Sequence, residues 1–485
     1  MLGDLTPHGA EYLRFLPEII LTIFGIIIMM LEAVTSERQK AVLGSIALVG
    51  IALAFAGNVL AYSDRGQAFQ NMILIDSYGS FFRGLVLVVG FLCILTSFSY
   101  LAREGAQSGE YYALILFSII GQCILATARD LIMVFIGLEI SSIATYILAG
   151  YLRDDRRNNE SALKYFLLGS FATAFLLYGI AWIYGLTGST NLDEIERFMS
   201  QQHPSVVAGL AASLIFVGLA FKVSVAPFQI WAPDVYQGAS APVSAFMSAG
   251  PKAAAFAIFF RIFMTSFGPL NERWIPVVWG CALLTMIIGN LAALVQTNVK
   301  RLLGYSSIAH AGYVLVALTS DSQIGIAAAM FYLASYALMN IGAFAVVSHI
   351  AGRHEQHVRI DDLAGLSRRE PATAALLAVF VFSLIGVPLT GGFFAKFYVF
   401  QAALDSHLVW LTVLGLVNSA IAAYYYLKII VAMYMRDPGE ATLEVTPLSM
   451  GTRVAIWASA LGVLILGIFP STLLSFASSS ASAFR

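Results

Sequence analysis

Residues 218–238 read GLAFKVSVAPFQIWAPDVYQG, an apolar run that contains a lysine, Lys222, and five residues later a proline, Pro227. The run starts like a membrane-spanning helix, in which a charged side chain at the bilayer centre costs at least about 2.5–3.5 kcal/mol. Proline adds a second penalty, because it lacks the N–H that continues the hydrogen-bond ladder of a helix. Two penalties this close together need a physical reason.

The composition places the chain in a membrane and excludes several classes of site. Of its 485 residues 59% are hydrophobic and 11% are charged, whereas soluble domains carry about 25% charged residues. The 27 basic and 28 acidic residues form no dense basic cluster, so nucleic acid is excluded as a partner. The sequence lacks a nucleotide-binding glycine motif, and Cys93, Cys123 and Cys281 lack the spacing of a zinc or iron–sulfur site. His354 and His357 in the stretch HEQH are expected in a solvated loop.

Fourteen apolar runs are long enough to cross a bilayer, for which a helix needs about 20 residues. Short polar spacers separate them, which predicts an all-α polytopic membrane protein without a soluble domain. The first run, Leu13 to Leu31, lacks a basic n-region and a cleavage site, so we expect a retained span rather than a signal peptide. The predicted spans are residues 13–32, 41–62, 74–101, 111–128, 130–151, 161–187, 205–231, 240–264, 274–296, 299–318, 323–350, 373–403, 407–434 and 453–475.

The basic residues of the loops predict the orientation, because Lys and Arg accumulate on the cytoplasmic side of a membrane protein. The loops after odd-numbered spans hold fourteen of them and the opposite side holds seven, which puts both termini outside the cytoplasm. The fourteen are Arg38, Lys40, Arg103, Arg153, Arg156, Arg157, Lys300, Arg301, Arg353, Arg359, Arg368, Arg369, Arg436 and Arg453, and the seven are Arg14, Arg65, Arg129, Arg197, Arg261, Arg273 and Arg485.

Three lysines and a glutamate lie deep within the predicted spans. Lys222, Lys252 and Lys396 are each more than ten residues from the nearest loop, which is roughly mid-membrane. Glu139 in span 5 lies at a similar depth, so we expect it to be a counter-ion inside the bundle. A static salt bridge that sets helix register is the alternative. Three lysines to one central glutamate leave an excess of positive charge that structural pairing does not explain.

The remaining charged residues of interest lie nearer the membrane surfaces. Arg83, near the outer end of span 3, is expected to extend its side chain to the headgroups. Lys164 and Lys428 lie within two turns of the cytoplasmic ends of spans 6 and 13, where anchoring at the interface is the simplest role and a functional role is the alternative. Asp234 is expected in the cytoplasmic loop after span 7, either as a loop cap or as the point of proton uptake.

Two spans carry helix breakers near their centres. Pro227 interrupts span 7, and Pro388 frees the carbonyl of Leu384 in span 12, where Gly391 and Gly392 loosen the helix further. Irregular backbone is tolerated at this depth only where protein or a water-filled cavity satisfies it. Paired interruptions, each with a buried lysine, indicate a transport site.

Spans 7 and 12 run in opposite directions and lie five spans apart, which predicts two inverted repeats, spans 4–8 and 9–13. Lys222 then corresponds roughly to Lys396, and Lys252 in span 8 to Lys428 in span 13, which gives Lys428 a second possible role beside anchoring. Span 10, the counterpart of span 5, contributes His310, which either relays protons or serves packing. The predicted units are residues 1–110, 111–264, 274–434 and 453–475.

Five titratable groups at similar depth predict proton handling in the plane of the membrane: Glu139, Lys222, Lys252, His310 and Lys396. Displacing the charge of the glutamate from Lys222 would release the proton of this lysine towards Lys252. Moving one proton against about 150 mV costs on the order of 3.5 kcal/mol, which one buried ion pair made and broken can supply.

Three long segments indicate a family: GLAFKVSVAPFQIWAPDVYQGASAPVSAF, TNVKRLLGYSSIAHAGY and GVPLTGGFFAKFYV. They resemble the antiporter-like subunits of proton-translocating NADH-quinone oxidoreductase, respiratory complex I, and the likeness covers nearly the whole chain. Lys396 in span 12 favours the N type of these subunits over the M type, which has a glutamate there. The chain also stops soon after span 14, whereas the L type continues into a long lateral helix.

The resemblance implies that Glu139, Lys222, Lys252 and Lys396 belong to a proton path. It implies that flavin, iron–sulfur clusters and quinone belong to partner subunits, with no cofactor in this chain, and that other membrane-arm subunits are its neighbours in a bacterial inner membrane. Subunits of a multisubunit cation/proton antiporter or a membrane-bound hydrogenase share these spans and lysines and form the alternative. A stand-alone solute carrier and an inert scaffold are further hypotheses.

Overall fold

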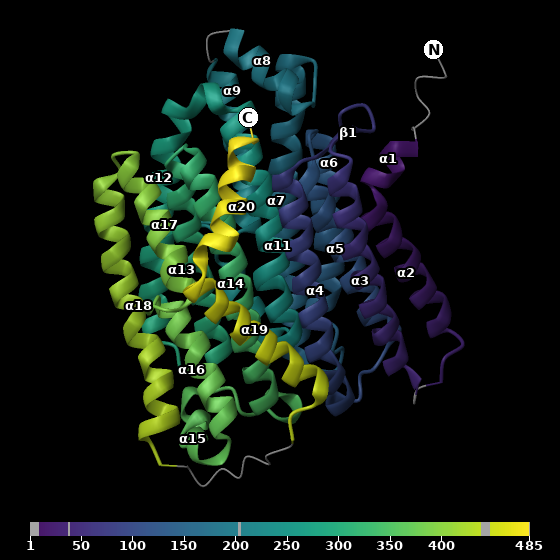
Figure 1. The fold of residues 1–485 in the computed structure, drawn as a ribbon, viewed down its shortest axis with the longest axis vertical. Coiled ribbons are helices and arrows are strands. Elements are labelled where there is room, and N and C mark those ends of the chain that lie inside the picture. The colour runs from purple at the N-terminus through teal and green to yellow at the C-terminus, as the bar shows by residue number, and fades with distance from the viewer. Residues whose placement is uncertain (1–8, 37–38, 202–204, 438–446, 485) are drawn as a thin grey trace.

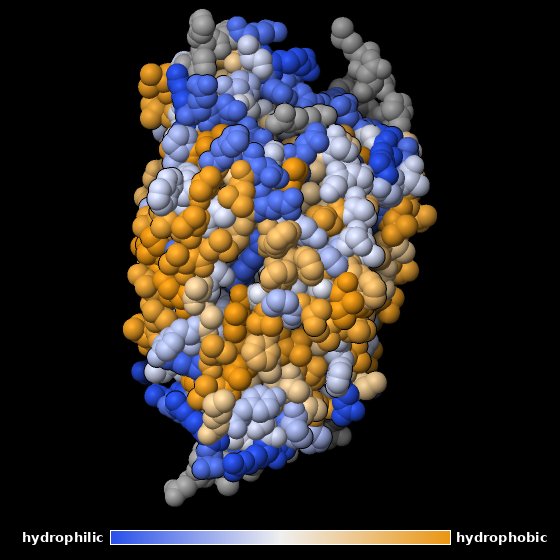
Figure 2. All heavy atoms as spheres, turned by 60° about the vertical axis from the view of Figure 1, so that its left-hand side comes forward, coloured by the Kyte–Doolittle hydropathy of each residue, from blue (hydrophilic) through white to orange (hydrophobic). Residues whose placement is uncertain are grey.

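The computed structural model is a bundle of long helices, most of which run along one common direction (Figure 1). It describes residues 9–36, 39–201, 205–437 and 447–484. Hydrophobic side chains form a broad band on the face shown in Figure 2, and hydrophilic ones gather at the two ends of the bundle. Within the described ranges eleven helices are long and apolar enough to cross a bilayer, so the chain is an integral membrane protein.

The described part of the chain contains twenty α-helices, three 3-10 helices, one π-helical turn and one β-hairpin, and every predicted span overlaps at least one α-helix. The hairpin joins β1 (Gly66–Ala68) to β2 (Ile73–Ile75) in an antiparallel pair. The helices are α1 (Gly9–Arg14), α2 (Leu16–Glu32), α3 (Ala41–Ser63), α4 (Ser77–Glu104), α5 (Gly109–Thr127), α6 (Leu131–Ala149), α7 (Arg156–Thr187), α8 (Leu192–Gln201), α9 (Val206–Lys222), α10 (Trp231–Gly238), α11 (Ala241–Arg261), α12 (Asn271–Leu294), α13 (Val299–Thr319), α14 (Gln323–Ile350), α15 (Leu366–Arg369), α16 (Pro371–Ile385), α17 (Gly391–Asp405), α18 (Val409–Met435), α19 (Met450–Ile468) and α20 (Pro470–Ser482).

The first and last helices lie at the same end of the bundle. Figure 1 shows α1 and the C-terminal end of α20 there, together with α8 and the β-hairpin. An even number of crossings is needed for this arrangement. Arg38 and Arg485, which entered the orientation count, lie outside the described residues.

Helices α11, α13 and α14 form the centre of the bundle and are almost wholly buried. Their sequences are apolar on all sides, which is typical of helices surrounded by other helices. By contrast, α7 and α18 bury one face and expose the other along the side of the bundle. Polar groups on the three central helices therefore need protein or water as partners.

Spans 7 and 12, in which the sequence predicted helix breakers, are both interrupted. Helices α9 and α10 flank a connector that contains Pro227, and α16 and α17 flank a connector that contains Pro388. Gly391 and Gly392, which we expected to loosen span 12, instead lie in the first turn of α17. The chain has already left the helix at Gly386, which adopts a left-handed conformation with φ 94°. The two glycines therefore serve close packing of the second half-helix rather than flexibility.

Gly392 holds the start of α17 against the end of α16. Its N–H donates to the hydroxyl of Ser383 at 3.1 Å, and a methyl group at this position would collide with the carbonyl oxygen of Ser383. We expect Gly392→Ala to destabilise the protein by about 1–3 kcal/mol, the usual cost of overpacking. Thermal unfolding measures the effect, with Gly280→Ala as control, since no atom lies within 4 Å of its added methyl. Equal unfolding temperatures for the two variants would contradict this packing role.

Asp234 lies in a helix, not in the loop where the sequence predicted it. Span 7 was predicted to end at residue 231, but α10 continues to Gly238. Pro233 stands in the first turn of α10, where a missing N–H costs no helical hydrogen bond. The prediction was wrong because Pro233, Asp234 and Gln237 give the segment the composition of a loop.

Arg83 is fully buried and does not reach the headgroups, which corrects the prediction. Its guanidinium lies 2.7 Å from the carboxylate of Glu18 on α2, and both side chains are 0% exposed. It also donates to the carbonyl of Arg14 at 3.0 Å. The prediction was wrong because α4 packs against α3, α5 and α11, so that the side chain is enclosed and its partner comes from a fourth helix.

Candidate functional site

Lys222 is the last residue of α9 and lies beside the broken segment of span 7. Its ammonium donates to the hydroxyl of Ser142 on α6 at 2.9 Å and to that of Tyr165 on α7 at 3.1 Å. It also lies 5.4 Å from the ring centroid of Tyr165 and 5.9 Å from that of Tyr146, close enough for cation–π attraction. Neutral groups therefore hold this buried ammonium.

Glu139 does not form an ion pair with Lys222, contrary to the expected role as counter-ion. The lysine bonds Ser142, which lies about one helical turn after Glu139 on α6. Glu139 is half-buried, on a helix whose residues Ile136 and Ile143 are 39% and 53% exposed at the side of the bundle. One of its carboxylate oxygens is buried without a hydrogen-bond partner. The sequence did not show that hydroxyls lie closer to the lysine than the carboxylate does.

Lys252 lies in the middle of α11 and is 2% exposed. Its ammonium donates to the backbone carbonyl of Ser307 on α13 at 3.0 Å and also to the hydroxyl of the same residue. Two tyrosines, Tyr236 of α10 and Tyr336 of α14, direct buried hydroxyls towards Ser307 without completing a hydrogen bond. In proteins, ordered water often bonds buried polar groups whose hydrogen bonds are otherwise incomplete, and such groups lie near Lys252.

Lys396 lies in α17 and closes the end of the preceding half-helix. Its ammonium donates to the carbonyls of Leu384 at 3.1 Å and Ile385 at 2.8 Å, and to the hydroxyl of Ser419 at 2.8 Å. These carbonyls lack intrahelical partners and carry the negative end of the helix dipole. The carbonyl of Leu384, predicted to be freed by Pro388, thus accepts a bond from the lysine itself. Lys222 precedes the interruption of its span whereas Lys396 follows the interruption of its own, so the predicted match between the two lysines does not extend to their positions.

His310 lies on the buried helix α13 and has a hydroxyl at each ring nitrogen. Nδ1 is 2.6 Å from the hydroxyl of Tyr332, and Nε2 is 3.3 Å from that of Tyr426. The hydroxyl of Tyr426 in turn bonds that of Ser306, the residue beside the partner of Lys252. An imidazole bonded on both sides has the geometry of a proton relay, and the same bonds also fix its packing.

A chain of hydrogen bonds continues from the tyrosines towards Lys396. The hydroxyl of Tyr425 donates to the amide oxygen of Asn290 at 3.1 Å, and the amide nitrogen of Asn290 lies 3.5 Å from the hydroxyl of Tyr313. The ring of Tyr313 lies 5.1 Å from the ammonium of Lys396. Our sequence reasoning missed these residues, although three consecutive tyrosines at 424–426, on an otherwise apolar helix, were a usable signal.

Lys164 and Asp234 meet at the end of the bundle opposite the termini. The ammonium of Lys164 lies 2.8 Å from Asp234 and 2.6 Å from Glu160, and Asp234 also accepts from Arg301 at 2.6 Å. Lys428 lies apart from this cluster and donates to the carbonyl of Leu294, the last residue of α12, at 2.8 Å.

The proposed match between Lys428 and Lys252 does not extend to their surroundings. Lys428 is half-buried and caps a helix end, whereas Lys252 is enclosed at the centre of the bundle. Anchoring, the simpler of the two expected roles of Lys428, agrees with this position.

Lys300 was counted as a loop residue, but it is 0% exposed and forms an ion pair with Glu355. Glu355 also accepts from the backbone N–H of Ala241 at 2.7 Å, so the loop after α14 is tied to the starts of α11 and α13. The stretch HEQH is therefore only partly solvated. His354 is exposed but lies 3.2 Å from Glu104, and His357 is half-buried. No local pattern reveals an ion pair between residues so far apart in the chain.

Comparison with known proteins identifies the family. The family described as "NADH:quinone oxidoreductase/Mrp antiporter, TM" matches residues 128–422. The "NADH-quinone oxidoreductase subunit N 1" of Solibacter usitatus (strain Ellin6076) is 60% identical over 472 residues, which are 97% of each chain. The chain belongs to the NADH-quinone oxidoreductase subunit N family. The resemblance inferred from the three sequence segments is thereby confirmed, as is the preference for the N type.

Solved structures share the fold. A chain of respiratory complex I from Thermus thermophilus matches with a TM-score of 0.82 at 35% identity, covering 95% of this chain and 99% of that chain. A chain of the Mrp complex from Dietzia sp. DQ12-45-1b matches with a TM-score of 0.85 at 20% identity, covering 97% of both chains. The second likeness shows the fold alone. Sequence rather than fold therefore separates a subunit N from an antiporter subunit.

Proposed function

We propose that this antiporter-like subunit moves protons across the membrane through Lys222, Lys252, His310 and Lys396, coupled to quinone reduction in partner subunits. The observation that carries the proposal is the kind of hydrogen-bond partner that the three lysines have. Each is at most 6% exposed, and within the described part of the chain each bonds hydroxyls or carbonyls and no carboxylate. A buried ammonium without a counter-ion is energetically costly, which favours a role in moving charge over a static ion pair.

Hydrogen bonds and close contacts support the following sequence of transfer. Lys222 begins the path at the broken segment of span 7, and Lys252 follows at the centre of the bundle. From Lys252 the path passes along Ser307 and Ser306 to Tyr426 and His310. It then follows Tyr425, Asn290 and Tyr313 to Lys396. Water beside the incompletely bonded hydroxyls of Tyr236 and Tyr336 completes the route between the first two lysines.

Glu139 controls the first step in this proposal. Its half-buried carboxylate lies one helical turn from Ser142, the present partner of Lys222. When the ammonium of Lys222 turns from Ser142 to Glu139, the attraction of opposite charges retains the proton. When the charge of Glu139 is drawn away, by a partner subunit at the exposed side of α6, the proton is released towards Lys252. Asp234 and Lys164, paired at the end of the bundle near α10, mark the point of proton uptake.

The finer architecture belongs to the same proposal. We expect fourteen crossings, in units 1–110, 111–264, 274–434 and 453–475, with the second and third as inverted repeats. The paired interruptions α9–α10 and α16–α17 support the repeats, and the shared end of α1 and α20 supports an even number of crossings. The twofold excess of basic residues in alternate loops supports an inner-membrane orientation with both termini outside the cytoplasm.

Partner subunits supply the redox chemistry in this proposal. The relatives are named as subunits of an NADH-quinone oxidoreductase, and the matching Thermus chain comes from an assembled respiratory complex I. We therefore infer that flavin, iron–sulfur clusters and quinone are bound by other subunits, and that neighbouring membrane-arm subunits cover part of the side of this bundle. The Mrp likeness, at 20% identity, favours no antiporter role.

Lys252→Met tests the path at its centre. The variant keeps the apolar length of the side chain and removes the exchangeable proton, so we expect several-fold less proton transport per NADH oxidised. The measurement is dye-monitored acidification of membrane vesicles energised with NADH, alongside the rate of NADH oxidation. Lys428→Met is the matched control, since this lysine caps a helix and lies apart from the path. Unchanged coupling in Lys252→Met, or an equal loss in Lys428→Met, would reject the path.

A further inference from the structure

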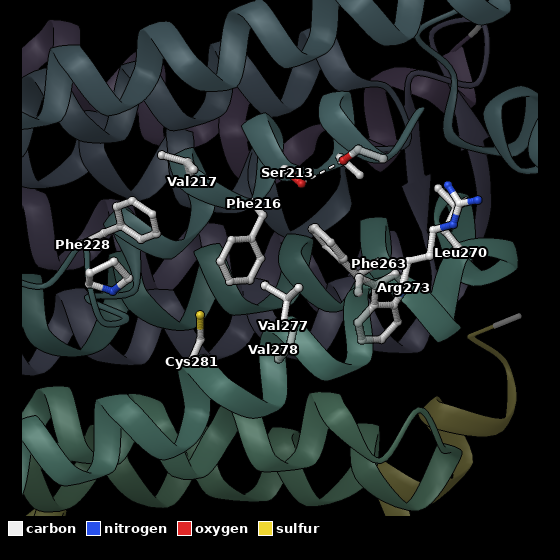
Figure 3. A pocket seen from close by; sticks show the side chains of 14 residues that line it. Ser213, Phe216, Val217, Phe228, Phe263, Leu270, Arg273, Val277, Val278 and Cys281 are labelled. Atoms are coloured by element: carbon white, nitrogen blue, oxygen red, sulfur yellow. Dashed lines mark hydrogen bonds between the residues drawn. The ribbon is translucent and has the colours of Figure 1, made fainter. Parts of the chain in front are cut away.

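An apolar crevice opens at the side of the bundle, and none of the three buried lysines lines it. It lies between α9 and α12, has a volume of about 300 Å³, and extends to the π-helical turn at residues 262–266 (Figure 3). Phe216 and Phe263 form an edge-to-face aromatic pair in its wall, with ring centroids 6.0 Å apart. The hydroxyl of Ser213 donates to the carbonyl of Gly209 at 2.8 Å and offers no free donor. Among the lining residues Arg273 alone carries a charge.

The crevice faces the hydrocarbon of the membrane. Its rim includes Val277 on α12, which is 55% exposed, and the exposed Pro227 in the break of span 7. Apolar side chains beside the crevice, Leu210 on α9 and Ile230 in the connector, are 51% and 73% exposed. In a membrane-spanning bundle an exposed apolar surface of this kind contacts lipid chains. A ligand of the crevice therefore enters from the bilayer.

The charge and the cavity are arranged along the membrane normal. Arg273 is the third residue of α12, at the end of the bundle that carries α8, and is exposed at the mouth of the crevice (Figures 1 and 3). Cys281, at the other end of the lining, lies eight residues deeper, about 12 Å along the helix. From the headgroup region inwards, the crevice thus presents first a cation and then an apolar slot that reaches the connector after α9.

We propose that this crevice binds an anionic phospholipid, with one acyl chain in the slot and the phosphate at Arg273. A guanidinium suits a phosphate because it offers several N–H donors in one plane. The side chain of Arg273 also donates to the backbone carbonyl of Ser205 at 3.2 Å, which holds the guanidinium at the mouth. The lining contains no carboxylate that would repel the headgroup.

The bound chain supports the broken helix. Pro227 and Phe228 line the inner end of the crevice and belong to the connector that joins Lys222 to α10. An empty slot leaves these side chains without packing partners on one side, and an acyl chain restores those contacts. The lipid is thus a structural ligand of the segment beside the first lysine. This inference does not depend on the proton path and is tested by lipid binding alone.

Photolabelling of the assembled complex tests the proposal. The probe is phosphatidylglycerol with a photoactivatable diazirine in one acyl chain, added to the wild-type complex in bilayer discs of phosphatidylcholine. After irradiation and proteolysis, we expect label on peptides that contain residues 206–217 and 273–281. Unlabelled phosphatidylglycerol should compete, and excess phosphatidylcholine should not.

Paired variants separate the charge from the slot. Arg273→Gln removes the cation and should lower the labelling of these peptides about fivefold, the effect of one basic residue on binding to anionic lipid. Val277→Trp fills the slot and should lower it similarly. The controls are Arg197→Gln, an exposed arginine on α8, and Leu284→Trp, a 41% exposed position on α12 outside the crevice.

Three results would overturn the proposal. Equal labelling by a phosphatidylcholine probe would show ordinary lipid contact without headgroup recognition. Labelling that persists in both Arg273→Gln and Val277→Trp would place the probe elsewhere. Absence of label from the wild-type peptides would mean that a helix of a neighbouring subunit, or another apolar ligand, fills the crevice.

Discussion

Lys222→Met is expected to reduce NADH-driven proton transport by at least about tenfold, the scale of losing a positioned acid–base group. The effect should exceed that of Lys252→Met for a structural reason. Near Lys252 the buried hydroxyls of Tyr236 and Tyr336 lack hydrogen-bond partners, and in our proposal water beside them offers a bypass. Lys222 is enclosed by Ser142 and two aromatic rings, and among the residues that the structure describes no second titratable amine bonds the same groups. Vesicle acidification per NADH oxidised is the measurement.

Lys222→Arg distinguishes proton exchange from a purely structural charge. Arginine keeps the positive charge and can still donate to Ser142 and Tyr165, but its guanidinium does not release a proton at accessible pH. If Lys222 only fixes the packing of α6, α7 and α9, the arginine variant should pump nearly as well as wild type. If the lysine must give up its proton, both variants should fail alike. Normal coupling in Lys222→Arg would reject the proposed role.

Arg83→Leu is expected to cost about 3–5 kcal/mol of stability, the second large effect. The substitution leaves the carboxyl group of Glu18 fully buried and without its partner. We expect a lower thermal unfolding temperature of the solubilised complex and less intact complex on native gels. Proton transport per NADH oxidised should be unchanged in the complexes that do assemble, because the pair lies outside the path.

The double variant Glu18→Leu with Arg83→Leu provides the control. Replacing both members of a buried ion pair with apolar residues removes the desolvation cost together with the attraction, and is often neutral. The double variant should therefore be more stable than Arg83→Leu alone. A single variant as stable as wild type, or a double variant no better than the single one, would show that the pair does not hold α2 against α4.

The difference between Arg83 and Lys222 shows what sequence patterns leave open. Both are basic residues in apolar runs, and depth along the run was the available guide. Depth correctly separated the enclosed Lys222, Lys252 and Lys396 from the half-buried Lys428. It failed for Arg83, because the nearest partner of a side chain depends on which helices are neighbours.

The amino-acid sequence by itself determined the membrane class, the positions of the long apolar helices, both interruptions and the family. These features depend on local chemistry. The length of an apolar run determines whether it can span the membrane, and a proline removes a hydrogen-bond donor. The segments typical of the family can be recognised without knowledge of the fold.

Only the tertiary structure decided the partners of the charged groups. In the structure Lys222 bonds a serine instead of Glu139, Lys396 bonds a carbonyl at the end of α16, and Lys300 forms an ion pair with the distant Glu355. The physical reason is that helices apolar on all sides do not encode which face meets which neighbour. Hydrogen bonds between residues far apart in the chain exist only once the bundle has packed.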